Sequence, residues 1–146
     1  MNRRAFLKKG LILGSGTLIA SYPFVIERYL IQINTYKIHI AHLPIEFDGF
    51  RILQLTDLHL GFLVSEMLIE YVVDKANSIR KDIIVCTGDY IHERNSTDQI
   101  DRVWPLLSKL PAEYEVHSVL GNHDHWGDFE RSNYWLNRSG QNIRHE

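Results

Sequence analysis

The sequence predicts an α/β fold with a mixed, largely parallel central sheet, preceded by a separate amino-terminal segment. Short apolar runs typical of buried strands alternate with stretches of helical periodicity, the pattern of consecutive βαβ units. Three of these apolar runs end in a glycine or aspartate turn. The first 30 residues differ in composition from everything that follows. We therefore divide the chain into residues 1–30 and one globular domain, residues 31–146.

The first elements of the domain are expected to be a half-exposed strand, a turn and a buried strand. Residues 31–40 alternate between apolar and polar side chains, the period of a strand with one solvated face. Leu43-Pro44 and Asp48-Gly49 then mark a turn. Further strands are expected at 50–56, 83–87 and 115–120, and helices at 65–81, 98–107 and 128–137.

The helix ends have sequence signals of their own. Ser65 is a good N-cap for the first helix, whose apolar stripe is expected to comprise Leu68, Val72, Ala76 and Ile79. Pro105 weakens the second helix. Ser139-Gly140 stops the third.

Residues 1–30 have the features of a targeting segment. Arg3 and Arg4 precede a mainly apolar, uncharged run over residues 10–26. The pattern resembles the bacterial twin-arginine signal. It implies the twin-arginine export machinery as a partner and a protein exported across, or anchored to, the cytoplasmic membrane on its extracytoplasmic side. The alternative is a basic amphipathic helix.

Composition narrows the classes of partner and cofactor. The chain is 45% hydrophobic, enough to bury a core, and its formal net charge of -2 gives no basic field, so no nucleic-acid partner is expected. Its one cysteine, Cys86, can form neither an internal disulfide nor a cysteine zinc cluster. We expect it to be a small buried apolar residue.

Polar side chains follow three of the predicted strands. The carboxyl ends of parallel strands face one crevice, so these side chains should meet although they are far apart in the sequence. Oxygen and nitrogen ligands without sulfur favour manganese, zinc or iron. The three groups are Asp57 with His59, Gly88-Asp89, and Gly121-Asn122-His123-Asp124.

These residue types suit a site with two divalent ions. Asp57 and His59 can bind one ion together, Asp89 can bridge two, and Asn122 can give an oxygen to the second. His123 is expected to face the substrate as a proton donor or cation, and Asp124 to orient its imidazole. Five other histidines are expected to be structural, solvated or at the rim of the site, namely His39, His42, His92, His117 and His125.

The three motifs together closely resemble the first half of the calcineurin-like metallophosphoesterases. The resemblance covers about residues 32–146. It implies an α/β/β/α sandwich with two ions between its sheets, the first held by Asp57, His59 and Asp89, the second by Asp89 and Asn122, with His123 at the phosphate. A later Gly-His-x-His motif of that family has no counterpart after Asp124. We therefore expect the amino-terminal half of such a domain, with an incomplete second ion site.

The expected function is hydrolysis of a phosphomonoester, phosphodiester or pyrophosphate bond by metal-activated hydroxide at a dinuclear site. A membrane-directed segment favours a lipid-linked phosphoester as substrate. The alternative is a truncated, membrane-anchored fragment that binds metal incompletely and does not catalyse. A nuclease is a third interpretation, for which Arg94, Arg102 and Lys109 are too sparse a basic groove.

Overall fold

The computed structural model describes residues 31–110 and 115–143. The chain forms two compact units, Met1–His39 and Ile40–Glu146. The twin-arginine-like segment lies outside the described residues. Within the described part of the chain, none of the helices is both long and apolar enough to cross a bilayer.

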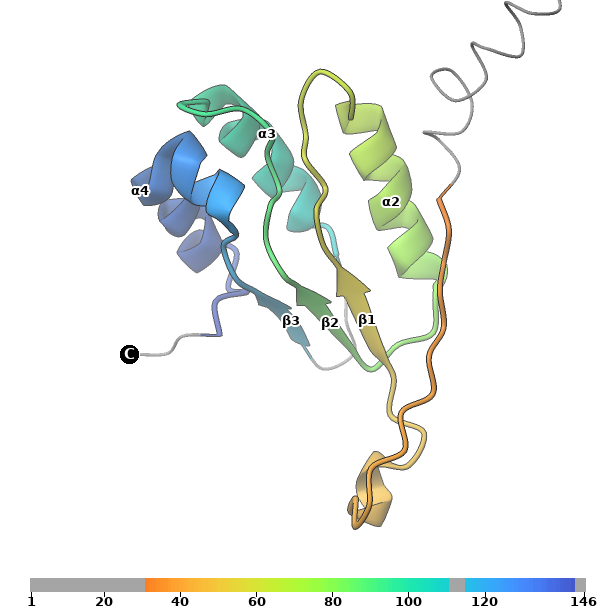
Figure 1. The fold of residues 1–146 in the computed structure, drawn as a ribbon. Helices are drawn as coiled ribbons and strands as arrows, with labels where there is room; N and C mark the ends of the chain where they lie inside the picture. Colours follow the sequence, from red (N-terminus) through yellow and green to blue (C-terminus); the bar gives the residue numbers. More distant parts are fainter. Residues whose placement is uncertain (1–30, 111–114, 144–146) are drawn as a thin grey trace, which may run out of the picture. The chain divides into compact units, whose positions relative to one another are not determined.

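The second unit contains a three-stranded parallel sheet in the order β1-β2-β3 (Figure 1). Ile52 lies opposite Ile83, and Ile83 opposite Glu115, so the strands are in register and their carboxyl ends share one edge. The parallel sheet expected from the sequence is confirmed. The strands are β1 (Ile52–Leu55), β2 (Ile83–Cys86) and β3 (Glu115–Ser118).

Three helices accompany the sheet, two of them close to their expected positions. The Ser65 hydroxyl accepts from the Leu68 amide and caps the first of them, as the sequence indicates. The last helix begins six residues earlier than expected and breaks at Asp128, whose carboxylate accepts from the Arg131 amide and caps the second half. The helices are α2 (Glu66–Ser78), α3 (Thr97–Leu107) and α4 (Asn122–Arg138).

One face of the sheet forms the core with the helices. Side chains alternate across each strand, so Ile84 and Cys86 are fully buried while Ile52 on the opposite face is exposed. Trp104 of α3 packs edge-on against Tyr90 at the centre of this core, with ring centroids 5.1 Å apart. The buried cysteine expected from the sequence is confirmed, and burial raises the pKa of the Cys86 thiol to about 11.

Two further expectations differ from the structure. Residues 31–40 contain no strand: the ladders of the described residues lie within the sheet β1-β2-β3, and a segment without a hydrogen-bonded neighbour does not form a strand. Helix α2 buries Ile69, Val73 and Ala76, a stripe one position later than the predicted Leu68 and Val72. A helix of 3.6 residues per turn presents both stripes almost equally, and packing against α3 selects one. The remaining element is a 3-10 turn, η2 (Ile45–Phe47), between residue 40 and β1.

Candidate metal centre

The loops that leave β1 and β2 run side by side beyond the sheet edge. The Asp57 amide donates to the Gly88 carbonyl at 3.2 Å, and the His59 amide donates to the Asp89 carbonyl at 2.9 Å. These backbone bonds continue the ladder of the parallel strands past their last residues. The two loops therefore hold their polar side chains next to each other without relying on side-chain contacts.

Three of the predicted ligands have a backbone conformation that is uncommon for their residue type. Asp57, His59 and Asp89 have φ angles of 55°, 48° and 58°, in the left-handed region. Each such residue costs about 1–2 kcal/mol relative to a right-handed one. Strain of this kind persists where the surrounding structure imposes it, and it gathers at functional sites. These three residues therefore keep a strained backbone conformation in the positions that bring their side chains together.

Gly88 and Gly121 bring the second and third loops into contact. A Cβ atom on Gly88 would lie 2.2 Å from the Gly121 amide nitrogen, and one on Gly121 would lie 2.2 Å from Asp89 Oδ1. Gly88 also has a φ of 94°. Only glycine fits the close approach at both positions, and at Gly88 only glycine adopts this φ without strain.

Asp57, His59 and Asp89 form a group that fits a divalent ion. One ligand atom from each lies within 4.8 Å of the others, and His59 Nε2 is 3.5 Å from Asp57 Oδ1. Ligands of one transition-metal ion, bound at about 2.1 Å, lie up to about 4.2 Å apart, so small side-chain rotations bring this set onto one ion. The donors are two carboxylates and an imidazole, a set that suits manganese, iron or zinc.

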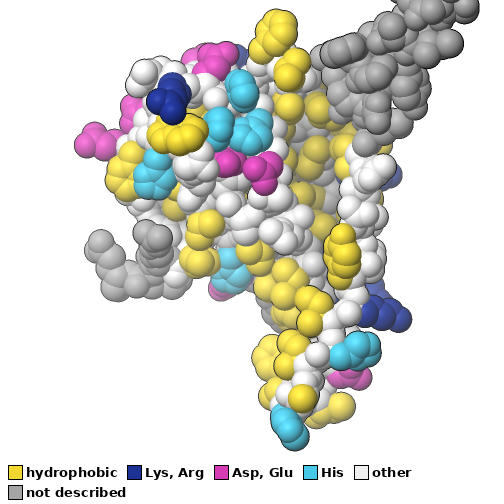
Figure 2. Space-filling view, in the orientation of Figure 1, with side chains coloured by type: hydrophobic (Ala, Val, Ile, Leu, Met, Phe, Trp, Pro, Cys, Tyr) yellow, Lys and Arg dark blue, Asp and Glu magenta, His cyan; other side chains and the backbone are white. Residues whose placement is uncertain are grey.

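The group is open to solvent and lies among other histidines. The side chain of Asp57 is 60% exposed and that of His59 27% exposed. Figure 2 shows histidine and acidic side chains gathered on one face, over the carboxyl ends of the strands. The group can therefore be reached from solvent without any opening of the core.

Asn122 and His123 begin helix α4 beside this group. The Asn122 side chain is exposed at the first helical residue. The His123 amide donates to Asp89 Oδ1 at 2.9 Å, and its ring lies 4.5 Å from the His59 ring, centroid to centroid. His123 Nδ1 is 2.9 Å from the His92 carbonyl oxygen, which fixes the direction of the imidazole. The structure thus brings His123 to the same place as the three candidate ligands.

Asp124 has a different partner from the one that the sequence suggested. Its carboxylate accepts from the backbone amides of Asp89 at 2.9 Å, Tyr90 at 3.0 Å and Gly121 at 2.8 Å. The His123 imidazole is oriented by a backbone carbonyl instead. Helical geometry explains the correction, since side chains at consecutive positions point in different directions.

The environment of Asp124 is that of a buried loop anchor. Its side chain is 1% exposed. Burial raises the pKa of the Asp124 carboxyl, while the three backbone donors act to lower it. The residue joins the second and third loops through their backbones and so supports the candidate ligands indirectly.

His92 is a member of the site that the sequence interpretation missed. Its ring nitrogen lies within 4.8 Å of ligand nitrogens of His59 and His123. It stands three residues after Asp89, in a loop where an isolated bridge pairs Leu60 with Ile91. The spacing Gly88-Asp89-x-x-His92 was the available signal, but a left-handed residue at Asp89 breaks the strand alternation that would have placed the side chain.

The comparisons with known proteins agree with this geometry. The family model described as calcineurin-like phosphoesterase matches residues 50–145. An uncharacterized metallophosphoesterase of Bacillus subtilis (strain 168), YkuE, is 35% identical over 133 residues, which cover 87% of this chain and 46% of that protein. An uncharacterized metallophosphoesterase of Aquifex aeolicus (strain VF5) is 27% identical over 126 residues, 86% of this chain and 47% of that protein.

A third relative has a named activity. The UDP-2,3-diacylglucosamine pyrophosphatase LpxG of Chlamydia trachomatis serovar D is 35% identical over 85 residues, 58% of this chain and 24% of that protein. No solved structure matches the chain significantly. The chain spans slightly less than half the length of each of the first two relatives. With its family model matched from residue 50 to residue 145 and its candidate ligands gathered at one sheet edge, this chain belongs to the calcineurin-like phosphoesterase family.

Proposed function

We propose that this chain contributes to metal-dependent hydrolysis of a phosphoester or pyrophosphate bond. The observation that carries the proposal is the convergence of Asp57, His59 and Asp89 within 4.8 Å. When bound at such a group, divalent ions supply a water ionised near neutral pH and neutralise charge on phosphate oxygens. Family membership supports the same reaction class.

The residues of the chain have separate roles in this proposal. Asp57, His59 and Asp89 hold a first ion, and Asp89 with Asn122 holds a second, manganese, zinc and iron being the candidates. His123 Nδ1 faces the His92 carbonyl, so the proton sits on Nδ1 and Nε2 is the nitrogen that meets a phosphate oxygen. A protonated His123 would donate there to the leaving group or to the charged phosphate.

The activity named for the Chlamydia relative, a UDP-2,3-diacylglucosamine pyrophosphatase, supports a lipid-linked pyrophosphate as one substrate class. The twin-arginine-like segment supports an extracytoplasmic, membrane-associated place of action. Phosphodiesterase and phosphomonoesterase activities belong to the same proposal. A net charge of -2 gives no support to a nucleic-acid substrate.

The test compares Asp89→Asn with Asp74→Asn in the full chain. Asparagine at position 89 keeps an oxygen that can accept from the His123 amide, so the loop bond survives while the ligand charge is lost. Asp74 is exposed on helix α2 and serves as the charge-matched control. With manganese and a p-nitrophenyl phosphodiester, a monoester and a pyrophosphate as substrates, Asp89→Asn should lose at least about 100-fold in rate, since even changes to residues that only hydrogen-bond the metal ligands cost about 10–100-fold. Equal rates for the two variants would overturn the assignment.

A metal-binding chain without turnover is the second candidate. One feature of the proposal favours it: the second ion is assigned only two ligands, Asp89 and Asn122. Manganese should then raise the unfolding temperature of the wild-type chain, because an ion that binds only the folded state stabilises it, while no substrate is hydrolysed. Hydrolysis abolished by Asp89→Asn would eliminate this candidate.

A further inference from the structure

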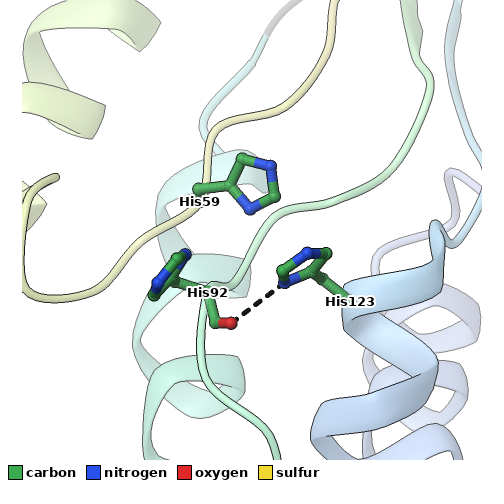
Figure 3. Close-up of side chains that lie close together, drawn as sticks. All are labelled: His59, His92 and His123. Atoms are coloured by element: carbon green, nitrogen blue, oxygen red, sulfur yellow. Dashed lines mark hydrogen bonds between the residues drawn. The ribbon is translucent and has the colours of Figure 1, made fainter.

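Three imidazoles meet beside the carboxylate group, although none of them is adjacent in sequence. The ring centroids of His59 and His123 are 4.5 Å apart, and His92 lies 5.9 Å from the first and 5.8 Å from the second. One ring nitrogen from each lies within 4.8 Å of the other two. Figure 3 shows the rings arranged around a common space, each arriving from a different loop or helix.

The position of His92 is imposed by its surroundings, although its side chain is exposed. Its amide donates to the Leu60 carbonyl at 3.0 Å and to Oε1 of the buried Gln99 at 3.1 Å. Its Cβ fills the space over Gly61, where an added Cβ would lie 2.8 Å away. The carbonyl of His92 holds His123. The backbone therefore presents this ring to the other two in a defined way.

The ring nitrogens needed for an ion have lone pairs available. His59 Nδ1 is 3.3 Å from the Ile91 carbonyl oxygen, and His123 Nδ1 is 2.9 Å from the His92 carbonyl oxygen. A carbonyl oxygen only accepts, so both protons sit on Nδ1 and both Nε2 atoms keep a lone pair. Among the described residues, the hydrogen bonds of His92 run through its amide and carbonyl, which leaves its ring nitrogens for a ligand.

This donor set has a different metal preference from the first group. Three imidazoles and a water form a tetrahedral zinc site, whereas two carboxylates and one imidazole suit manganese as well. The two groups share His59, whose Nε2 also faces Asp57 at 3.5 Å. One nitrogen cannot bind two ions at once. Occupation of the imidazole group thus withdraws His59 from the carboxylates.

We propose that His59, His92 and His123 form an alternative site for an imidazole-preferring ion such as Zn²⁺ or Ni²⁺, exclusive with manganese at Asp57, His59 and Asp89. An ion there also engages the nitrogen with which His123 would meet a phosphate. The alternative site is therefore inhibitory. The inhibition rests on the proposed function, but binding of the ion does not.

Binding is tested with Zn²⁺ alone on the full, tag-free chain by titration calorimetry. His92→Ala should lower Zn²⁺ affinity by about 10-fold or more, as loss of one of three protein ligands requires. His125→Ala is the matched control, because that imidazole is exposed on the same helix as His123 but stacks on Phe129 instead. Asp89→Asn should keep Zn²⁺ binding while losing manganese. Unchanged Zn²⁺ affinity in His92→Ala, with folding verified by thermal unfolding, would overturn the site.

Inhibition is a separate measurement. Zn²⁺ added to the manganese-activated chain should abolish hydrolysis at concentrations about 10-fold lower for wild type and His125→Ala than for His92→Ala. Equal inhibition of all three would refute the inhibitory role. If the chain hydrolyses nothing, the proposed function fails, while the calorimetric comparison of His92→Ala with His125→Ala still decides the site.

Discussion

Replacing Asp124 by asparagine should destabilise the chain although it changes only one atom of the side chain. In the wild type, Oδ1 accepts from the Tyr90 amide and Oδ2 accepts from the amides of Asp89 and Gly121. Asparagine has one accepting oxygen, and its amino group donates. In either orientation, at least one backbone N–H therefore faces another donor.

The magnitude follows from which amide is left without an acceptor. If the carboxamide oxygen takes the place of Oδ2, the amide of Tyr90, a fully buried residue, is unsatisfied, at a cost of about 1–3 kcal/mol. The remaining hydrogen bonds become weaker, because their acceptor is no longer charged. Because burial raises the pKa of the Asp124 carboxyl, removing the charge recovers part of this loss. We expect a net loss of about 2 kcal/mol, against a typical domain stability of about 5–15 kcal/mol.

Urea unfolding followed by tryptophan fluorescence measures this loss, with the buried Trp104 as a core probe. At a slope of about 2 kcal/mol per molar urea, the midpoint should fall by about 1 M. Glu130→Gln removes the same charge from an exposed position of helix α4 and should change the midpoint little. If Asp124→Asn stays within about 0.5 kcal/mol of that control, the three backbone bonds do not hold the loops together and our account of this residue is wrong.

Three further predictions concern packing, acid stability and reactivity. Gly88→Ala should lower the free energy of unfolding in urea by about 3 kcal/mol or more, because the new Cβ would lie 2.2 Å from the Gly121 nitrogen and the positive φ is unfavourable for alanine. Gly49→Ala is the control: its φ is also positive but the space around it is open, so it should cost only about 1 kcal/mol. Asp101 accepts two hydrogen bonds from Arg131, which lower the pKa of its carboxyl. Its contribution to the free energy of unfolding is therefore complete above the ordinary carboxyl pKa of about 4 and disappears as pH falls through the lower pKa of the folded chain. The difference in stability between wild type and Asp101→Ala should accordingly shrink in acid, and a difference that does not change with pH would contradict this. Cys86, buried and with a raised pKa, should react with a thiol reagent at neutral pH only after unfolding, and rapid labelling of the native chain would show that β2 is accessible.

Local sequence signals located most of the elements in the second unit. The apolar runs that became β2 and β3 are bounded by turn residues, and Ser65 caps α2 where an N-cap was expected. These features depend on neighbours within a few positions. The predicted strand at 31–40 is wrong because alternation describes a face, whereas a strand also needs a hydrogen-bonding partner, which the local sequence does not contain.

The site was predicted in outline, but the backbone that forms it was not. Asp57 and His59 were expected to bind one ion together, and His59 Nε2 and Asp57 Oδ1 do lie 3.5 Å apart. Both residues are in fact left-handed, so the alternation of a strand does not apply to them. The contact arises because backbone bonds to Gly88 and Asp89 fix the loop between them.

Short motifs were enough to locate the strand ends, the glycines and the residue types of the candidate ligands, since each is encoded within a few neighbouring positions. The folded chain was needed to show that His92 joins His59 and His123, and that Asp124 binds backbone amides rather than an imidazole. The cause is that a side chain's direction follows from φ and ψ. Where left-handed residues and loop-to-loop hydrogen bonds set those angles, the pattern of apolar and polar residues along the chain no longer reports them.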